Sequence, residues 1–127
     1  MSSDDRDYWS LRPNAPAVGT PLCAAAAIPH GAAREFRFGR GRSAFRMFVV
    51  RSRASFRGYL NLCPHFSLAL NHEPDAFVFD GYIRCSRHFA EFRLDDGLCV
   101  SGACVDNRLI AVPISENDGG ELLIGRL

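Results

Sequence analysis

Two Cys/His pairs constrain this chain more than any other feature of its sequence. The first is Cys63 and His65, one residue apart inside the mainly apolar run "NLCPHFSLAL" (61–70). The second is Cys85 and His88, two residues apart in "CSRH". Thiolate and imidazole groups are common ligands of zinc and iron. A fold that brings the two pairs together would therefore form one metal site with four protein ligands.

Short aromatic and β-branched runs predict an all-β domain of antiparallel strands. Near alternation of apolar and polar positions within these runs is typical of strands, and Gly, Arg and Ser separate them. No window has the length and period of an amphipathic helix. The predicted strands lie at 34–41, 44–50, 55–63, 108–114 and 121–125, and predicted hairpins lie at 77–85 and 91–100.

Two Asp-Gly dipeptides predict hairpin turns, at Asp80-Gly81 and at Asp96-Gly97. A type I′ turn needs positive φ at both central residues, which Asp-Gly adopts at low cost. The first hairpin would turn the chain back, so that the second Cys/His pair faces the first. If the strand 55–63 continues through the following proline, Cys63 and His65 share a face, because side chains two apart point the same way.

Length and charge limit the function classes. A chain of 127 residues with 47% hydrophobic residues suits one globular domain. All fifteen basic residues are arginines, and with fourteen acidic residues the net charge is only +1, which argues against a polybasic nucleic-acid surface. The charge is uneven, since residues 1–62 carry ten Arg and four acids while residues 63–127 carry five Arg and ten acids.

The N-terminal segment 1–19 is interpreted as a tail, with Tyr8 and Trp9 able to pack back on the domain. It lacks the cationic and apolar regions of a signal peptide. The apolar stretch 21–28 is shorter than the roughly 20 residues that span a bilayer. Five cysteines without an export signal favour a reducing compartment. We therefore expect a soluble, cytoplasmic protein without a membrane anchor.

The types of the candidate ligands are compatible with two kinds of metal site. Two thiolates and two imidazoles suit a structural zinc, or a [2Fe–2S] cluster with His on one iron. Zinc fingers place Cys-Cys and His-His on separate elements, whereas each pair here is mixed. The order Cys-x-His then Cys-x-x-His resembles the Rieske iron–sulfur family. The resemblance covers roughly residues 20–125 and is carried by "YLNLCPH" (59–65), Phe92 and "DDGLCVSGACVDNRLIAVPI" (95–114).

The resemblance implies a Rieske-like fold with a cluster-binding subdomain at about residues 60–94. In such a cluster Cys63 and Cys85 would hold one iron, and His65 and His88 the other. Family members usually place Gly-Pro in a third loop, where this chain reads "SGAC" with Ala103 in the Pro position.

Residues near the proposed ligands indicate the subfamily. Rieske proteins of cytochrome complexes carry a loop disulfide and two hydroxyls near the cluster. This chain has Leu68 and Arg87 at the disulfide positions, and Ala90 and Phe92 at the hydroxyl positions. It therefore resembles the ferredoxin components of ring-hydroxylating oxygenases, which implies electron transfer from a flavoprotein reductase to a terminal oxygenase or other redox enzyme.

Two other functions remain open: an interaction module with a structural zinc, and a redox subunit permanently bound to another oxidoreductase. Phe66 and Phe89 directly follow the His ligands. They either pack inward in place of the usual small residues or line an apolar docking face.

The remaining Cys and His residues have simpler interpretations. The cysteines are read as small buried hydrophobic residues in apolar strands, and the histidines as solvated loop residues. These residues are Cys23, Cys99, Cys104, His30 and His72.

Overall fold

The computed structural model describes residues 9–52, 55–62, 69–71, 75, 77–85, 90–102 and 107–125. This part of the chain is all-β, which confirms the predicted fold class. No helix within it has the length and apolar character needed to cross a membrane. Its strands and 3-10 turns are β1 (Pro21–Ala24), η2 (Ala25–Ala27), β2 (Ala33–Phe38), η3 (Gly41–Ser43), β3 (Phe45–Arg51), β4 (Phe56–Leu60), β5 (Val78–Phe79), β6 (Tyr82–Arg84), β7 (Glu91–Phe92), β8 (Cys99–Ser101), β9 (Ala111–Val112), β10 (Ile114–Glu116) and β11 (Glu121–Ile124).

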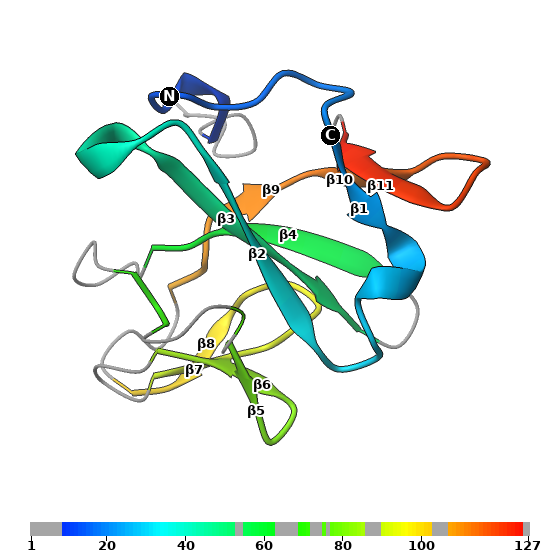
Figure 1. Ribbon diagram of the computed structural model, residues 1–127. Helices are drawn as coiled ribbons and strands as arrows, with labels where there is room; N and C mark the ends of the chain where they lie inside the picture. Colours follow the sequence, from blue (N-terminus) through cyan, green and yellow to red (C-terminus); the bar gives the residue numbers. More distant parts are fainter. Residues whose placement is uncertain are drawn as a thin grey trace, which may run out of the picture.

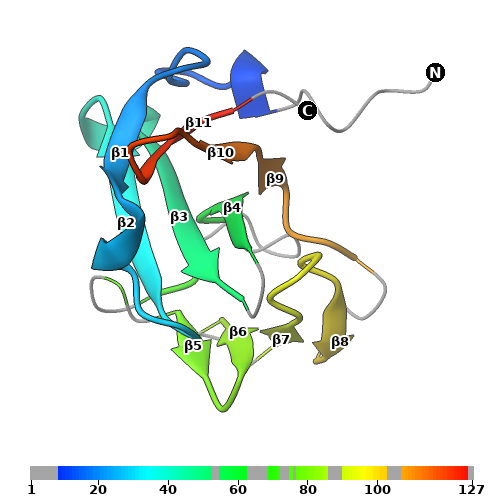
Figure 2. The same ribbon diagram turned by 90° about the vertical axis from the view of Figure 1, so that its right-hand side faces the viewer.

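These strands form three antiparallel sheets that lie as layers (Figure 1). The central sheet has the order β2-β3-β4-β9. The terminal sheet, β1-β11-β10, covers one side of it, and the hairpin sheet, β5-β6-β7-β8, covers the other. Figure 2 shows the same layering from the side. The hairpin sheet holds Cys85 and therefore positions one of the candidate ligands.

Strand β3 lies between the two hydrophobic cores, and both of its faces are buried. Met47 and Val49 pack in the cluster toward the terminal sheet, while Phe48 and Val50 pack in the cluster toward the hairpin sheet. All four side chains are fully buried. A strand between two cores needs apolar residues on both faces, which explains the unbroken run "MFVV" where simple alternation was expected.

Pro113 divides the predicted strand 108–114 into two strands of different sheets. β9 pairs with β4 in the central sheet, whereas β10 pairs with β11 in the terminal sheet. Proline has no backbone N–H to donate, so the ladder is interrupted at this position and the chain crosses between layers there.

The Asp80-Gly81 turn has the predicted conformation, with φ of 52° at Asp80 and 84° at Gly81. The second predicted turn differs. Its hairpin forms, but only Gly97 has positive φ, at 71°. The loop is longer than two residues, because Arg93 N–H donates to the Leu98 carbonyl and Gly97 N–H donates to the Arg93 carbonyl.

The described end of the N-terminal segment packs on the terminal side of the central sheet. Trp9 is buried, and its ring lies edge-on to Phe45 with centroids 6.4 Å apart. This agrees with the expectation that Trp9 packs back, whereas Tyr8 lies outside the described residues.

Candidate metal centre

The hairpin β6–β7 forms the stem of the loop that carries His88. Ile83 pairs with Phe92 and Arg84 with Glu91. One step further, Cys85 N–H donates to the Ala90 carbonyl at 2.9 Å. This bond closes the hairpin at Cys85, so the stem holds Cys85 and Ala90 together at the start and end of the segment 86–89.

Cys85 points into the core of the molecule. Its side chain is fully buried, in the same cluster as Ile83, Phe92 and Ala90. Side chains two apart share a face of a strand, so Ile83 and Cys85 both point toward the central sheet. The thiol is therefore held by the hairpin sheet and shielded from water.

Asn61 bonds residues on both sides of the segment that contains Cys63 and His65. It is 4% exposed and follows β4 directly. Its Oδ1 accepts the Leu70 N–H at 2.7 Å, and its Nδ2 donates to Asn71 Oδ1 at 2.8 Å. Its backbone N–H donates to the Arg46 carbonyl at 2.9 Å. The Asn61 side chain therefore forms hydrogen bonds with Leu70 and Asn71, which follow the segment 62–69.

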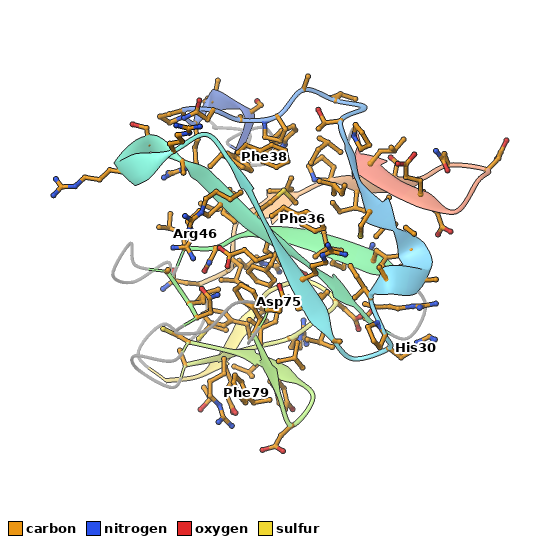
Figure 3. All side chains as sticks on the ribbon, viewed as in Figure 1. His30, Phe36, Phe38, Arg46, Asp75 and Phe79 are labelled. Atoms are coloured by element: carbon orange, nitrogen blue, oxygen red, sulfur yellow. The ribbon has the colours of Figure 1, made fainter. Side chains whose placement is uncertain are left out.

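An ion pair on the central sheet supports Asn61. Glu35 Oε2 accepts from Asn61 Nδ2 at 3.1 Å and from Arg46 Nε at 2.8 Å, and Glu35 Oε1 accepts from Asn71 Nδ2 at 3.1 Å. Glu35 N–H donates to Asp75 Oδ1 at 2.7 Å. Figure 3 shows Arg46 beside the end of β4. We call Glu35, Arg46, Asn61 and Asn71 the loop clamp.

A third loop stem packs against the second. Gly102 has φ of 103°, and a Cβ on it would lie 2.9 Å from Ala90 Cα. Cys99 N–H donates to the Asn107 carbonyl at 2.8 Å and so joins the two ends of the segment between them. Leu70, Cys85 and Ala90 belong to one buried cluster. One described end of the first loop, Leu70, and both ends of the second, Cys85 and Ala90, therefore belong to the same buried cluster, and the third loop packs on Ala90 through Gly102.

Of the four candidate ligands, the structure describes Cys85. Cys63, His65 and His88 lie outside the described residues. The same holds for the other residues discussed in the loops, namely Phe66, Leu68, His72, Arg87, Phe89, Ala103 and Cys104. β4 ends at Leu60, and the Leu62 N–H donates to the Leu60 carbonyl, so the chain turns before Cys63. The assumption of a strand continuing to Cys63 was wrong.

Outside the loops, Cys99 and His30 fit their simple interpretations, whereas Cys23 is less buried than expected. Cys99 is buried in the core, with its Sγ 3.4 Å from the Ser101 carbonyl. Cys23 is half-buried, and desolvation raises the pKa of its thiol despite the nearby Arg34. His30 is exposed, and Figure 3 places it on the opposite side of the molecule from Arg46.

Sequence reasoning missed the loop clamp. Its signal was present in "YLNLC", where an amide interrupts an apolar run two residues before Cys63. A buried Asn needs hydrogen-bond partners, which indicates a local structural role. The partners on β2 and β3 could not be recognised without the fold.

These features define a small all-β protein with one buried thiol, Cys85, at the stem of a hairpin, in a chain whose other Cys/His pair follows a strand of the central sheet. The chain belongs to the Rieske [2Fe–2S] domain family, whose model matches residues 19–114. The cofactor of this domain is a [2Fe–2S] cluster. The described residues fit such a group, because Cys85 supplies a buried sulfur in the cluster that also contains Leu70 and Ala90 at the ends of the loop segments.

Solved structures share the fold. The ferredoxin of carbazole 1,9a-dioxygenase from Nocardioides aromaticivorans IC177 superposes with a TM-score of 0.66 at 23% identity, covering 87% of this chain and 100% of that chain. The Sphingomonas yanoikuyae B1 ferredoxin gives 0.62 at 19% identity, covering 86% and 99%. The terminal oxygenase of carbazole 1,9a-dioxygenase from Novosphingobium sp. KA1 gives 0.66 at 16% identity, covering 96% of this chain but 33% of that chain. None of the curated proteins matches the chain.

Proposed function

We propose that this protein is a one-electron carrier whose [2Fe–2S] cluster is held by Cys63 and Cys85 on one iron and by His65 and His88 on the other. When bound, the cluster accepts and releases single electrons. The observation that carries the proposal is the buried Cys85 thiol at the stem of the hairpin, within a chain that belongs to the Rieske family.

The two ligand types have different tasks in this proposal. The thiolates of Cys63 and Cys85 bind iron with negative charge, whereas neutral imidazoles cancel less of the positive charge of the irons. This difference raises the potential above that of a cluster with four Cys ligands. The two stems hold the described residues on either side of the ligand segments, which lie within the proposed cluster-binding subdomain at about residues 60–94.

The partners of the proposed carrier are a flavoprotein reductase as donor and a terminal oxygenase as acceptor. One structure with this fold is a complex of reduced oxygenase and oxidized ferredoxin in carbazole 1,9a-dioxygenase, matched at 22% identity and a TM-score of 0.66. The match covers 87% of this chain and 96% of the matched chain of that complex. We place this chain in the cytoplasm, in line with its cysteine content, and assign docking to the region of Phe66 and Phe89.

Metal analysis tests the proposal. Purified without oxygen after iron-replete expression, the protein should be red-brown and contain about two irons and two acid-labile sulfides. The substitution Cys63→Ser should remove both. The control Cys23→Ser changes a half-buried thiol in β1 and should retain both. One zinc per chain with no visible absorption would show instead that the site is structural.

A further inference from the structure

A hollow lined by arginines lies beside the first ligand loop. Its volume is about 220 Å³, and Arg12, Arg42 and Arg46 contribute to its wall. Leu62 and Ala69, the described residues on either side of the segment 63–68, also line it. No acidic residue is among the described lining residues. The hollow therefore combines positive charge with the two ends of a proposed redox loop.

Arg46 is held in place for binding by its ion pair. Its Nη2 lies 2.7 Å from Glu35 Oε2, and its Nε donates to the same oxygen at 2.8 Å. The Nη1 group makes no hydrogen bond to a described residue. A guanidinium fixed on one edge loses less rotamer entropy when its other edge binds an anion. Arg46 thus offers two fixed N–H donors, and Asn61 of the loop clamp also lines the hollow.

Two exposed arginines add positive charge here: Arg42, which lines the hollow, and Arg37, which lies beside Arg46 on the neighbouring strand. Arg42 lies in η3 and is exposed. Arg37 is also exposed, and it is the cross-strand partner of Arg46, so that two like charges are directly opposed. Such a pair is unfavourable unless negative charge is nearby. Glu35, the acid next to them, is already bonded to Arg46, Asn61 and Asn71. Among the described residues at this part of the surface, the arginines therefore outnumber the acids.

We propose that the arginine hollow is a docking site for a carboxylate on an acidic surface of a redox partner. The inference rests on the proposed electron carrier, because it places the contact at the stem of a ligand loop. Planar guanidinium groups match carboxylates well. A protein surface is favoured over a nucleic acid because the net charge is only +1 and the apolar residues among the described lining are aliphatic, such as Leu60 and Leu62.

Small redox probes test whether the hollow directs electron transfer. The dithionite-reduced holoprotein passes one electron to hexacyanoferrate(III), an anion, or to hexaammineruthenium(III), a cation, and each metal complex is reduced by one unit. At low ionic strength Arg42→Glu should slow the reaction with the anion roughly fivefold and speed the reaction with the cation. The expected change is smaller than the increase in association rate that a whole charged surface can give. High salt should remove both effects.

Arg108→Glu is the matched control. Arg108 is exposed and does not line the hollow, and its reversal changes the net charge by the same amount. Equal effects of the two substitutions on both probes would overturn the proposal, because only the net charge would then matter.

Peptide binding separates this proposal from the cluster assignment. Calorimetric titration with a hexaglutamate peptide should show binding that Arg42→Glu weakens at least fivefold and Arg108→Glu does not, whether or not the protein holds a cluster. A protein that contains zinc but shows this pattern would contradict the electron carrier alone. Absence of peptide binding, or tighter binding of a six-nucleotide RNA, would overturn the carboxylate site alone.

Discussion

At the scale of single residues, Asn61 joins the central sheet to the first ligand loop. Its amide is the centre of the loop clamp, and its Oδ1 satisfies the buried Leu70 N–H. Removing a buried partner leaves such groups without hydrogen bonds, which costs more than the net worth of the bonds themselves.

We expect Asn61→Ala to destabilise the protein by about 2–3 kcal/mol, because it leaves Leu70 N–H and Glu35 without this partner. Urea denaturation followed by circular dichroism measures the change. Asn107→Ala alters an exposed side chain at the end of the third loop and should stay within about 0.5 kcal/mol. Equal losses for both variants would show that the clamp does not hold the loop.

A second residue prediction concerns Asp96. The hydrogen bond from Arg93 holds the pKa of this carboxyl down at about 2, and the Leu98 N–H assists by donating to Oδ1. A pKa depressed in the folded state adds stability above the unfolded value of about 3.9, and that stability is lost as the pH falls toward 2.

Asp96→Asn should therefore lower the free energy of unfolding by less than about 1 kcal/mol at pH 7, because the pair is partly exposed. The gap between wild type and variant should hold down to pH 5 and shrink between pH 4 and 2.5. Urea denaturation across this range measures it. A gap that grows on acidification would contradict the assigned pKa.

At the scale of elements, the two Asp-Gly hairpins differ in what surrounds their glycines. Gly81 has φ of 84° and open space around its Cα, whereas a Cβ on Gly97 would lie 2.8 Å from the Tyr59 ring. Tyr59 also donates its hydroxyl to the Leu94 carbonyl at 2.8 Å. The second hairpin is therefore packed onto the central sheet, while the first is free at its tip.

We expect Gly81→Ala to cost about 1 kcal/mol, the strain of positive φ alone. Gly97→Ala should cost about 2–4 kcal/mol, because overpacking against Tyr59 adds to the same strain. Thermal and urea denaturation of the two variants give the difference directly. Similar losses would mean that the Tyr59 ring moves aside easily.

At the scale of the whole molecule, the two faces of the central sheet pack in two separate hydrophobic cores. One core, with Trp9, Phe45 and Ile124, fixes the terminal sheet, and the other holds Cys85. Ala90 and Phe92 are buried in the second core near Cys85, and neither carries a hydroxyl. Hydrogen bonds to cluster sulfurs raise the potential of a cluster by stabilising its reduced state.

For the proposed cluster we therefore expect a midpoint potential near the low end of the Rieske range, which runs from about −150 to +300 mV. Ala90→Ser should raise the potential by supplying a hydroxyl. Ala111→Ser, an exposed change in β9, is the control and should leave the potential unchanged. Protein-film voltammetry measures all three proteins. A wild-type value above about +150 mV, in the upper part of that range, would argue against the ferredoxin-type assignment.

The sequence alone determined the fold class, most strand positions and the family. Alternating runs and an Asp-Gly turn are local signals, since side-chain period and backbone φ depend on neighbouring residues. The Cys/His order is likewise readable without coordinates, and the family match over residues 19–114 agrees with it.

Tertiary structure decided what depends on contacts between distant residues. β1 was missed because the short "PLCA" becomes a strand by pairing with β11 at the other end of the chain. The split at Pro113, the burial of both faces of β3 and the longer Asp96-Gly97 loop follow from packing between sheets. The loop clamp joins residues from position 35 to position 71, and the arginine hollow joins residues from 12 to 69. Such sites depend on long-range pairing, which no local pattern in the sequence records.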